Sequence, residues 1–173
     1  MDYALHALIE NMLGLVGAKP EADIKQLKPD IVRFESFSYV ASLKAMEMMS
    51  HIIEDSVTDM PGVMDFMVSF QYMSRLKNQL GRYAQLASAS QKMILLGEID
   101  WQIPAWPRTT VIDTKGDPMQ DYWFVVADGA GVGMALLAQQ VADKPRRYRG
   151  FFTFDRGISH HVATTIRALL EKK

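Results

Sequence analysis

The chain has 173 residues, of which 49% are hydrophobic and 23% are charged, and its formal net charge is −1. This length and composition fit one globular domain with a sizeable core, and the balanced charge argues against general nucleic-acid binding. The absence of cysteine excludes disulfides, thiol catalysis and thiolate metal sites.

The start of the chain and its hydropathy predict a cytoplasmic protein with no membrane partner. Residues 1–3 lack the basic start of a secretory signal peptide. No apolar run approaches the roughly 18 residues that a membrane-spanning helix needs. The twelve methionines, many of them between residues 46 and 73, favour an adaptable core, with a plastic ligand pocket or interface as the alternative.

Residues 1–35 are predicted to form an N-terminal helix and a connector. Asp2 is a candidate N-cap, and apolar residues recur at helical spacing from Leu5 to Leu13. We expect the apolar face of this helix to pair with a second copy of the chain in a homodimer; packing on the body of the domain is the alternative. One helical turn is expected within 21–27. Because Pro29 disfavours a helix before it, an edge strand is expected at 31–34.

Residues 36–96 are predicted to form a helix, a strand, a helix and a strand. Ser36 or Ser38 is expected to cap the first helix, because apolar residues from Tyr39 to Val57 trace one helical face. The apolar run 65–71 predicts an interior strand, and a helix over 73–87 and a strand over 92–96 follow. The last three elements predict a βαβ unit with parallel strands.

The remaining residues are predicted to be mainly β structure with a closing helix. Prolines within 101–107 exclude a regular helix there, and strands are predicted at 109–113, 122–127, 134–138 and 150–155. Asp155 or Ser159 is expected to start the last helix. The fold class is therefore α+β (α/β-like), a single domain with a mixed central sheet of about five or six strands, a βαβ unit and flanking helices.

Polar side chains follow both strands of the predicted βαβ unit, and ligands gather at the carboxyl ends of strands in such sheets. The helix before the unit adds a histidine and a carboxylate. The predicted ligand-binding residues are His51, Glu54, Gln71, Arg75, Glu98, Asp100 and Trp101. The tryptophans at 101, 106 and 123 are candidates to line a pocket for a flat ligand, with packing under a loop as the alternative.

A basic segment at 144–149 is predicted to be a loop. Its arginines, Arg146, Arg147 and Arg149, are candidates to bind a phosphate or an acidic partner, and a solvated loop is the alternative. No catalytic or metal site is expected, because the sequence has no Gly-x-Ser-x-Gly elbow and its four histidines form no clear ligand set. The glycines of residues 128–133 lack the spacing of a dinucleotide fingerprint. The sequence assigns no cofactor.

Short segments in order along the chain resemble the DICT domain family, the sensory module named for diguanylate cyclases and two-component systems. They are SHIIED at 50–55, SFQ at 69–71, RYAQLA at 82–87, LGEID at 96–100 and GFFTFD at 150–155. The resemblance implies an α+β sensory domain over residues 36–173, preceded by the helix and connector of 1–35. Such domains are typically fused to cyclic di-GMP enzymes or histidine kinases, and a part in light responses is a hypothesis for the family.

The resemblance implies a non-enzymatic sensory or regulatory module of bacterial signal transduction, in cyclic di-GMP or two-component pathways. No cyclase, phosphodiesterase or kinase segment is recognised in the sequence. We therefore expect a signalling partner of one of these kinds (diguanylate cyclase, phosphodiesterase or histidine kinase), together with a small-molecule ligand. The absence of cysteine disfavours a covalent bilin. Two alternatives stay open: an interaction adaptor without a ligand, and a small enzyme that binds a nucleotide or flavin.

Overall fold

The computed structural model describes residues 3–32 and 35–173. The strands are β1 (Ser36–Ser42), β2 (Met64–Tyr72), β3 (Lys92–Glu98), β4 (Thr109–Asp113), β5 (Tyr122–Gly129), β6 (Val132–Gln140) and β7 (Arg147–Thr153). The α-helices are α1 (Ala4–Leu13), α2 (Glu21–Ile24), α3 (Pro29–Val32), α4 (Leu43–Asp59), α5 (Leu80–Ala89) and α6 (Arg156–Glu171). Two 3₁₀ helices, η1 (Met73–Gln79) and η2 (Pro118–Asp121), complete the described elements.

All seven strands form one sheet in the order β1-β7-β6-β5-β2-β3-β4. β3 pairs in parallel with β2 on one side and with β4 on the other, whereas every other pairing in the sheet is antiparallel. The predicted βαβ unit is therefore confirmed as β2, η1 with α5, and β3. The parallel and antiparallel parts of the sheet meet where β2 pairs with β5.

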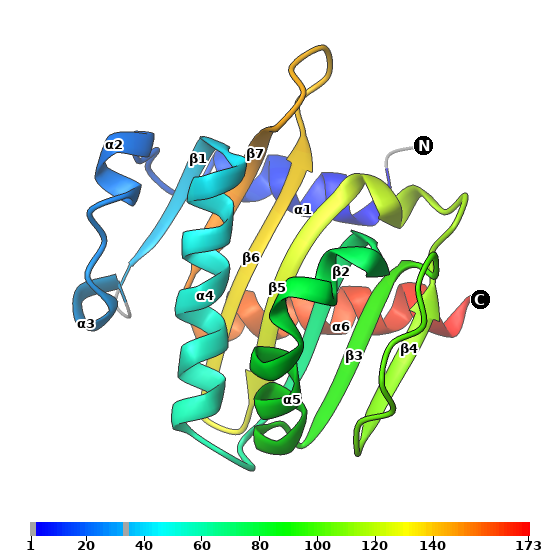
Figure 1. The fold of residues 1–173 in the computed structure, drawn as a ribbon. Helices are drawn as coiled ribbons and strands as arrows, with labels where there is room; N and C mark the ends of the chain where they lie inside the picture. Colours follow the sequence, from blue (N-terminus) through cyan, green and yellow to red (C-terminus); the bar gives the residue numbers. More distant parts are fainter. Residues whose placement is uncertain (1–2, 33–34) are drawn as a thin grey trace.

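Helices cover both faces of the sheet. Figure 1 shows α4 and α5 in front of the sheet and α1 and α6 behind it. β2 contributes side chains to the hydrophobic cores on both faces of the sheet, because successive side chains of a strand point to opposite faces. Phe66 and Val68 belong to the core on the α4/α5 side, and Met67 belongs to the core on the α1/α6 side. In the described part of the chain, no helix is long and apolar enough to cross a membrane.

The predicted helix from residue 36 is wrong in its first part. Residues 36–42 form strand β1, and α4 begins after Ser42, whose side chain accepts a hydrogen bond from the Ala45 N–H. β1 pairs along its length with β7, and Phe37, Tyr39 and Ala41 are buried at two-residue spacing. This long-range pairing outweighs the helical spacing, because strand formation depends strongly on tertiary context.

Two other predictions in the connecting segments need correction. The edge strand expected at 31–34 is wrong where it can be compared, since Val32 ends helix α3; residues 33–34 lie outside the described residues, as does the proposed cap Asp2. The basic segment is a turn only up to Arg146. Arg147 and Arg149 belong to β7, between β1 and β6.

The apolar face of α1 is buried within the chain. Leu5 and Ile9 are at most 1% exposed, and the helix contacts α6, β6 and β7. The prediction that this face pairs with a second copy is wrong, and the alternative of packing on the domain is confirmed. Five methionines are also fully buried and belong to the hydrophobic core: Met46, Met49, Met64, Met67 and Met73.

Candidate functional site

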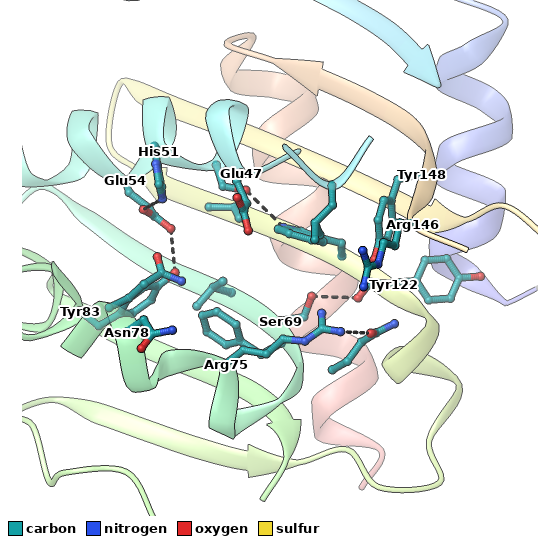
Figure 2. A pocket seen from close by; sticks show the side chains of 18 residues that line it. Glu47, His51, Glu54, Ser69, Arg75, Asn78, Tyr83, Tyr122, Arg146 and Tyr148 are labelled. Atoms are coloured by element: carbon teal, nitrogen blue, oxygen red, sulfur yellow. Dashed lines mark hydrogen bonds and ion pairs between the residues drawn. The ribbon is translucent and has the colours of Figure 1, made fainter. Parts of the chain in front are cut away.

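A pocket of about 590 Å³ lies on the α4/α5 side of the sheet. Its walls come from α4 and from η1 with the start of α5, and its floor comes from β2 and β5. Arg146 of the β6–β7 connection and Tyr148 of β7 close one end (Figure 2). The volume lies in the range usual for small-molecule sites. The pocket adjoins the line where parallel and antiparallel strands meet.

The wall from α4 is set by helical spacing. Glu47, Ser50, His51 and Glu54 are three or four residues apart and therefore share one side of the helix. Ser50 is 4% exposed; its hydroxyl donates to the Met46 carbonyl at 2.8 Å and accepts from Trp123 Nε1 at 3.2 Å. This bond holds the indole of β5 against the helix.

A local irregularity of β2 shapes the floor. The register between β2 and β3 shifts between Ser69 and Tyr72. The Ser69 hydroxyl donates to the Tyr122 carbonyl at 3.0 Å and accepts from the Phe124 N–H at 2.8 Å. This side chain therefore joins β2 to β5 just beyond Val68, where the backbone pairing of these two strands ends. Beyond this point Gln71 and Arg75 line the pocket, and Arg75 Nη2 donates to Gln71 Oε1 at 2.7 Å.

One end of the pocket is built on a buried carboxylate. Glu54 is 2% exposed, and it accepts hydrogen bonds from Arg82 Nε and, at 2.7 Å, from the Tyr83 hydroxyl. Arg82 also donates to Asp55 at 2.7 Å and to the His51 carbonyl at 3.1 Å. Burial, reinforced by the charge of Glu54, raises the pKa of Tyr83 well above 10, so its phenol remains a donor.

The other end of the pocket carries positive charge. Arg75 and Arg146 are both exposed, and within the described residues neither has a carboxylate oxygen within 4 Å. Figure 2 shows the two side chains reaching toward the end of the pocket marked by Ser69 and Tyr122. Two guanidinium groups without an internal counter-ion are suited to an anion from outside the chain.

The structure gathers four of the seven predicted ligand residues in this pocket: His51, Glu54, Gln71 and Arg75. Of the three predicted tryptophan candidates, Trp123 also lines it. The site therefore combines the end of β2 with α4, as the sequence analysis expected for these residues.

Glu98, Asp100 and Trp101 do not line the pocket. Glu98 pairs with Lys115 at 3.1 Å. Asp100 accepts hydrogen bonds from the Ser74 N–H and hydroxyl at the start of η1, and these bonds lower its pKa. The Trp101 ring lies under Lys77, whose Nζ is 5.6 Å from the ring centroid.

The three predicted partner-binding arginines separate. Arg146 lines the pocket, whereas Arg147 pairs with Glu21 at 3.1 Å and Arg149 pairs with Glu10. Arg147 and Arg149 thus fasten β7 to α2 and α1. These two pairs are structural contacts between segments far apart in the sequence.

Sequence reasoning missed several pocket residues. Glu47 could have been found from its helical spacing to His51 and Glu54, and Asn78 from its spacing to Arg75. Tyr148 had no such signal, because its position depends on the place of β7 beside β6. In the part of the chain that the structure describes, no group of three His, Asp or Glu side chains could hold a metal ion.

A protein-family model matches most of the chain. The model of the DICT family, described as a sensory domain in diguanylate cyclases and two-component systems, matches residues 24–141. No curated protein and no solved structure matches the chain. The matched range contains every residue of the pocket except Arg146 and Tyr148, and it ends before the GFFTFD segment at 150–155.

Proposed function

This chain belongs to the DICT family of sensory domains, and we propose that it is a non-enzymatic regulatory module that binds a small molecule in the pocket between α4 and η1. It acts in bacterial signal transduction, in a cyclic di-GMP or two-component pathway. Its partner is a diguanylate cyclase, a phosphodiesterase or a histidine kinase. The observation that carries the proposal is the pocket itself, since a pocket of this size with convergent polar groups is a typical ligand site.

Ligand binding in this pocket would couple separate segments of the chain. A bound molecule contacts α4, η1, β5 and the β6–β7 connection together. Such a ligand stabilises the arrangement that it fits and shifts the population toward it. Lys44 and Asp55 of α4 are exposed beside the pocket, three and four residues from Glu47 and His51, so a partner that contacts this exposed side of the helix can read the shift.

The test combines an absorption spectrum with native mass spectrometry of the purified protein. We expect the native mass to exceed that of the chain by the mass of a small molecule. An absorption band in the visible range would support a part in light responses. Asn78→Trp, which places an indole at the pocket wall, should remove the added mass. Gln85→Trp on exposed α5 surface is the matched control and should keep it. A wild-type protein at its bare mass that also fails to gain mass from a cell extract would contradict a ligand-bearing sensor.

An interaction adaptor without a ligand is the second candidate, and one surface favours it. Tyr72 and Ile99 are 43% and 49% exposed. They lie near each other, because Tyr72 pairs with Glu98, the residue just before Ile99. If this surface docks a partner, Tyr72→Ser together with Ile99→Ser should abolish capture of a diguanylate cyclase or kinase while Asn78→Trp leaves capture unchanged. The opposite pattern would favour the ligand sensor.

The third alternative is an enzyme that acts on a nucleotide or flavin. The acids on which that alternative depended, Glu98 and Asp100, are outside the pocket and engaged with Lys115 and Ser74. A turnover lost on Glu98→Ala or Asp100→Ala would revive it.

A further inference from the structure

We propose that the ligand of this pocket is an aromatic anion: a flat heteroaromatic ring that carries a phosphate or carboxylate group. The inference rests on the proposed function, because it names the class of molecule that the same pocket binds. It is carried by three features of the pocket, namely its cationic end, its aromatic floor and its unused polar groups.

The cationic end selects an anionic group. Arg82, Arg147, Arg149 and Arg167 each have a carboxylate partner within the chain. Arg75 and Arg146 have none among the described residues, although both line the pocket (Figure 2). Guanidinium groups bind phosphate and carboxylate through parallel hydrogen bonds, and an anion between them would also relieve the repulsion of two like charges.

The Arg75 side chain and the backbone of Arg146 are fixed before any ligand arrives. Arg75 is held by its 2.7 Å hydrogen bond to Gln71 and lies 5.9 Å from the centroid of the Tyr72 ring. Arg146 adopts a φ of 63° in the turn before β7, a conformation that few residues other than glycine adopt. A group that is fixed in advance loses less conformational entropy on binding, so it favours affinity.

The aromatic side chains of the pocket select a flat ring. Phe70 and Trp123 line the floor, Tyr148 lies at the adjoining end, and the Trp123 and Tyr148 rings meet edge to face with centroids 5.3 Å apart. Since Trp123 is also bonded to Ser50, its indole plane is held in place. Rigid aromatic faces bury a planar ring at low entropic cost.

The remaining polar groups can read the edge of that ring. Glu47, Asn78 and Gln79 line the pocket, and among the described residues they have no side-chain hydrogen-bond partner. A carboxylate and two amides supply both acceptors and donors, as the ring nitrogens and amino groups of a heterocycle require. With a volume of about 590 Å³, the pocket has room for a ring and an anionic group together.

The test uses pairs of compounds that differ only in the anionic group. Adenosine monophosphate is compared with adenosine, and flavin mononucleotide with riboflavin, by isothermal titration of the purified full chain. We expect the phosphorylated member of at least one pair to bind at least about tenfold more tightly than its neutral counterpart, because charge-assisted hydrogen bonds are strong. A parallel arm compares quinoline-2-carboxylate with quinoline and shows whether a carboxylate can take the place of the phosphate.

Variants then assign the effect to the two arginines. Arg75→Gln and Arg146→Gln should each lower the affinity for the anionic compound about tenfold and leave the affinity for the neutral one unchanged. Arg149→Gln is the matched control, because Arg149 pairs with Glu10 away from the pocket. Melting temperatures of all three variants show whether a loss of binding comes from unfolding. Arg75→Lys should restore part of the affinity, since it keeps the charge but not the fork of donors.

Three results would each overturn the proposal. The first is equal affinity for both members of every pair. The second is an affinity for the anions that Arg75→Gln and Arg146→Gln leave unchanged. The third is no binding of any anionic compound at millimolar concentration. The proposed function can stand when this inference fails: if the purified protein carries a neutral molecule that Asn78→Trp displaces, the pocket is a ligand site but its ligand is not an aromatic anion.

Discussion

Glu54 connects the stability of the domain to the shape of its pocket. Its carboxylate is almost wholly buried and is compensated by Arg82 and Tyr83, which come from the helix on the opposite wall. A buried charge is tolerated only when it is paired and hydrogen-bonded. The same contacts that satisfy Glu54 therefore join α4 to α5 across one end of the pocket.

We expect Glu54→Ala to lower the free energy of unfolding by about 2–4 kcal/mol, because it removes two hydrogen bonds to a charge and leaves the Tyr83 hydroxyl buried without its acceptor. Asp55→Ala is the control: it removes the other carboxylate of Arg82, but the Asp55 side chain is 65% exposed. Exposed ion pairs contribute about 1 kcal/mol or less. Urea unfolding of both variants checks this, and equal losses would contradict the assigned role of Glu54.

Glu21 makes a pH-dependent link between α2 and the start of α4. Hydrogen bonds from Ser42, with the Arg147 guanidinium, lower the pKa of Glu21 from 4.5 to about 2. A lowered folded-state pKa gives stability that is present above pH 4.5 and is lost as the pH falls toward 2. Glu21→Gln should therefore lower the urea midpoint at pH 7 and show a smaller further loss at pH 3 than the wild type does.

The control for Glu21 is Asp23→Asn, which changes a neighbouring exposed carboxylate of the same helix. Asp23→Asn should leave the difference between the urea midpoints at pH 7 and pH 3 as it is in the wild type. A Glu21→Gln variant with the full wild-type acid loss would show that this carboxylate does not carry the effect.

At the scale of single residues, sequence reasoning found the part of the site that follows from local rules. His51 and Glu54 were found because helical spacing places them on one side of α4, and Gln71 and Arg75 because they follow a strand end. Glu98 and Asp100 follow a neighbouring parallel strand, yet their side chains are engaged by Lys115 and Ser74. Periodicity and strand order fix where a backbone lies, but side-chain partners decide which way a carboxylate turns.

Among the elements, β7 is the strand that ties the N-terminal part of the chain to the sheet. It lies between β1 and β6, and its Gly150 has no room for a side chain, because a Cβ there would collide with the Leu137 carbonyl of β6. Glycine is therefore required at this position by the close approach of two backbones.

We expect Gly150→Ala to lower the free energy of unfolding by about 2–3 kcal/mol or more, because the strands must move apart. Gly81→Ala is the opposite case: Gly81 lies in α5 with nothing within 4 Å of an added Cβ. Alanine there should stabilise the protein by about 0.5–1 kcal/mol, since it suits a helix better than glycine. Thermal unfolding of the two variants checks the contrast, and a destabilised Gly81→Ala with an intact Gly150→Ala would contradict the described backbone.

Element prediction failed where long-range pairing decided the outcome. The sequence from Tyr39 onward fits helical spacing, but Phe37, Tyr39 and Ala41 also alternate, and pairing with β7 settles the choice in favour of a strand. β7 is more than a hundred residues away, so no local signal could show this partner. By contrast, the βαβ unit and the closing helix were predicted, because each depends on a local pattern of apolar residues or on a cap such as Asp155.

The whole molecule divides its tasks between the two faces of the sheet. The face covered by α1 and α6 is a closed apolar core, whereas the face covered by α4 and α5 contains both a core and the pocket. Because the sheet separates the two layers, a change in one layer reaches the other mainly through the overall stability of the fold. Binding and stability should therefore respond to different substitutions.

We expect Leu5→Ala to lower the free energy of unfolding by about 2–4 kcal/mol, because Leu5 is fully buried behind the sheet, and to leave the ligand mass in the native spectrum. Gln71→Ala and Arg75→Ala should do the reverse: each should remove or reduce the ligand mass, while the melting temperature stays close to that of the wild type. Both side chains lie at the pocket and neither is in the core. If all three variants lost stability equally, Gln71 and Arg75 would be structural. If Leu5→Ala alone released the ligand, the occupied site would lie on the α1/α6 side of the sheet.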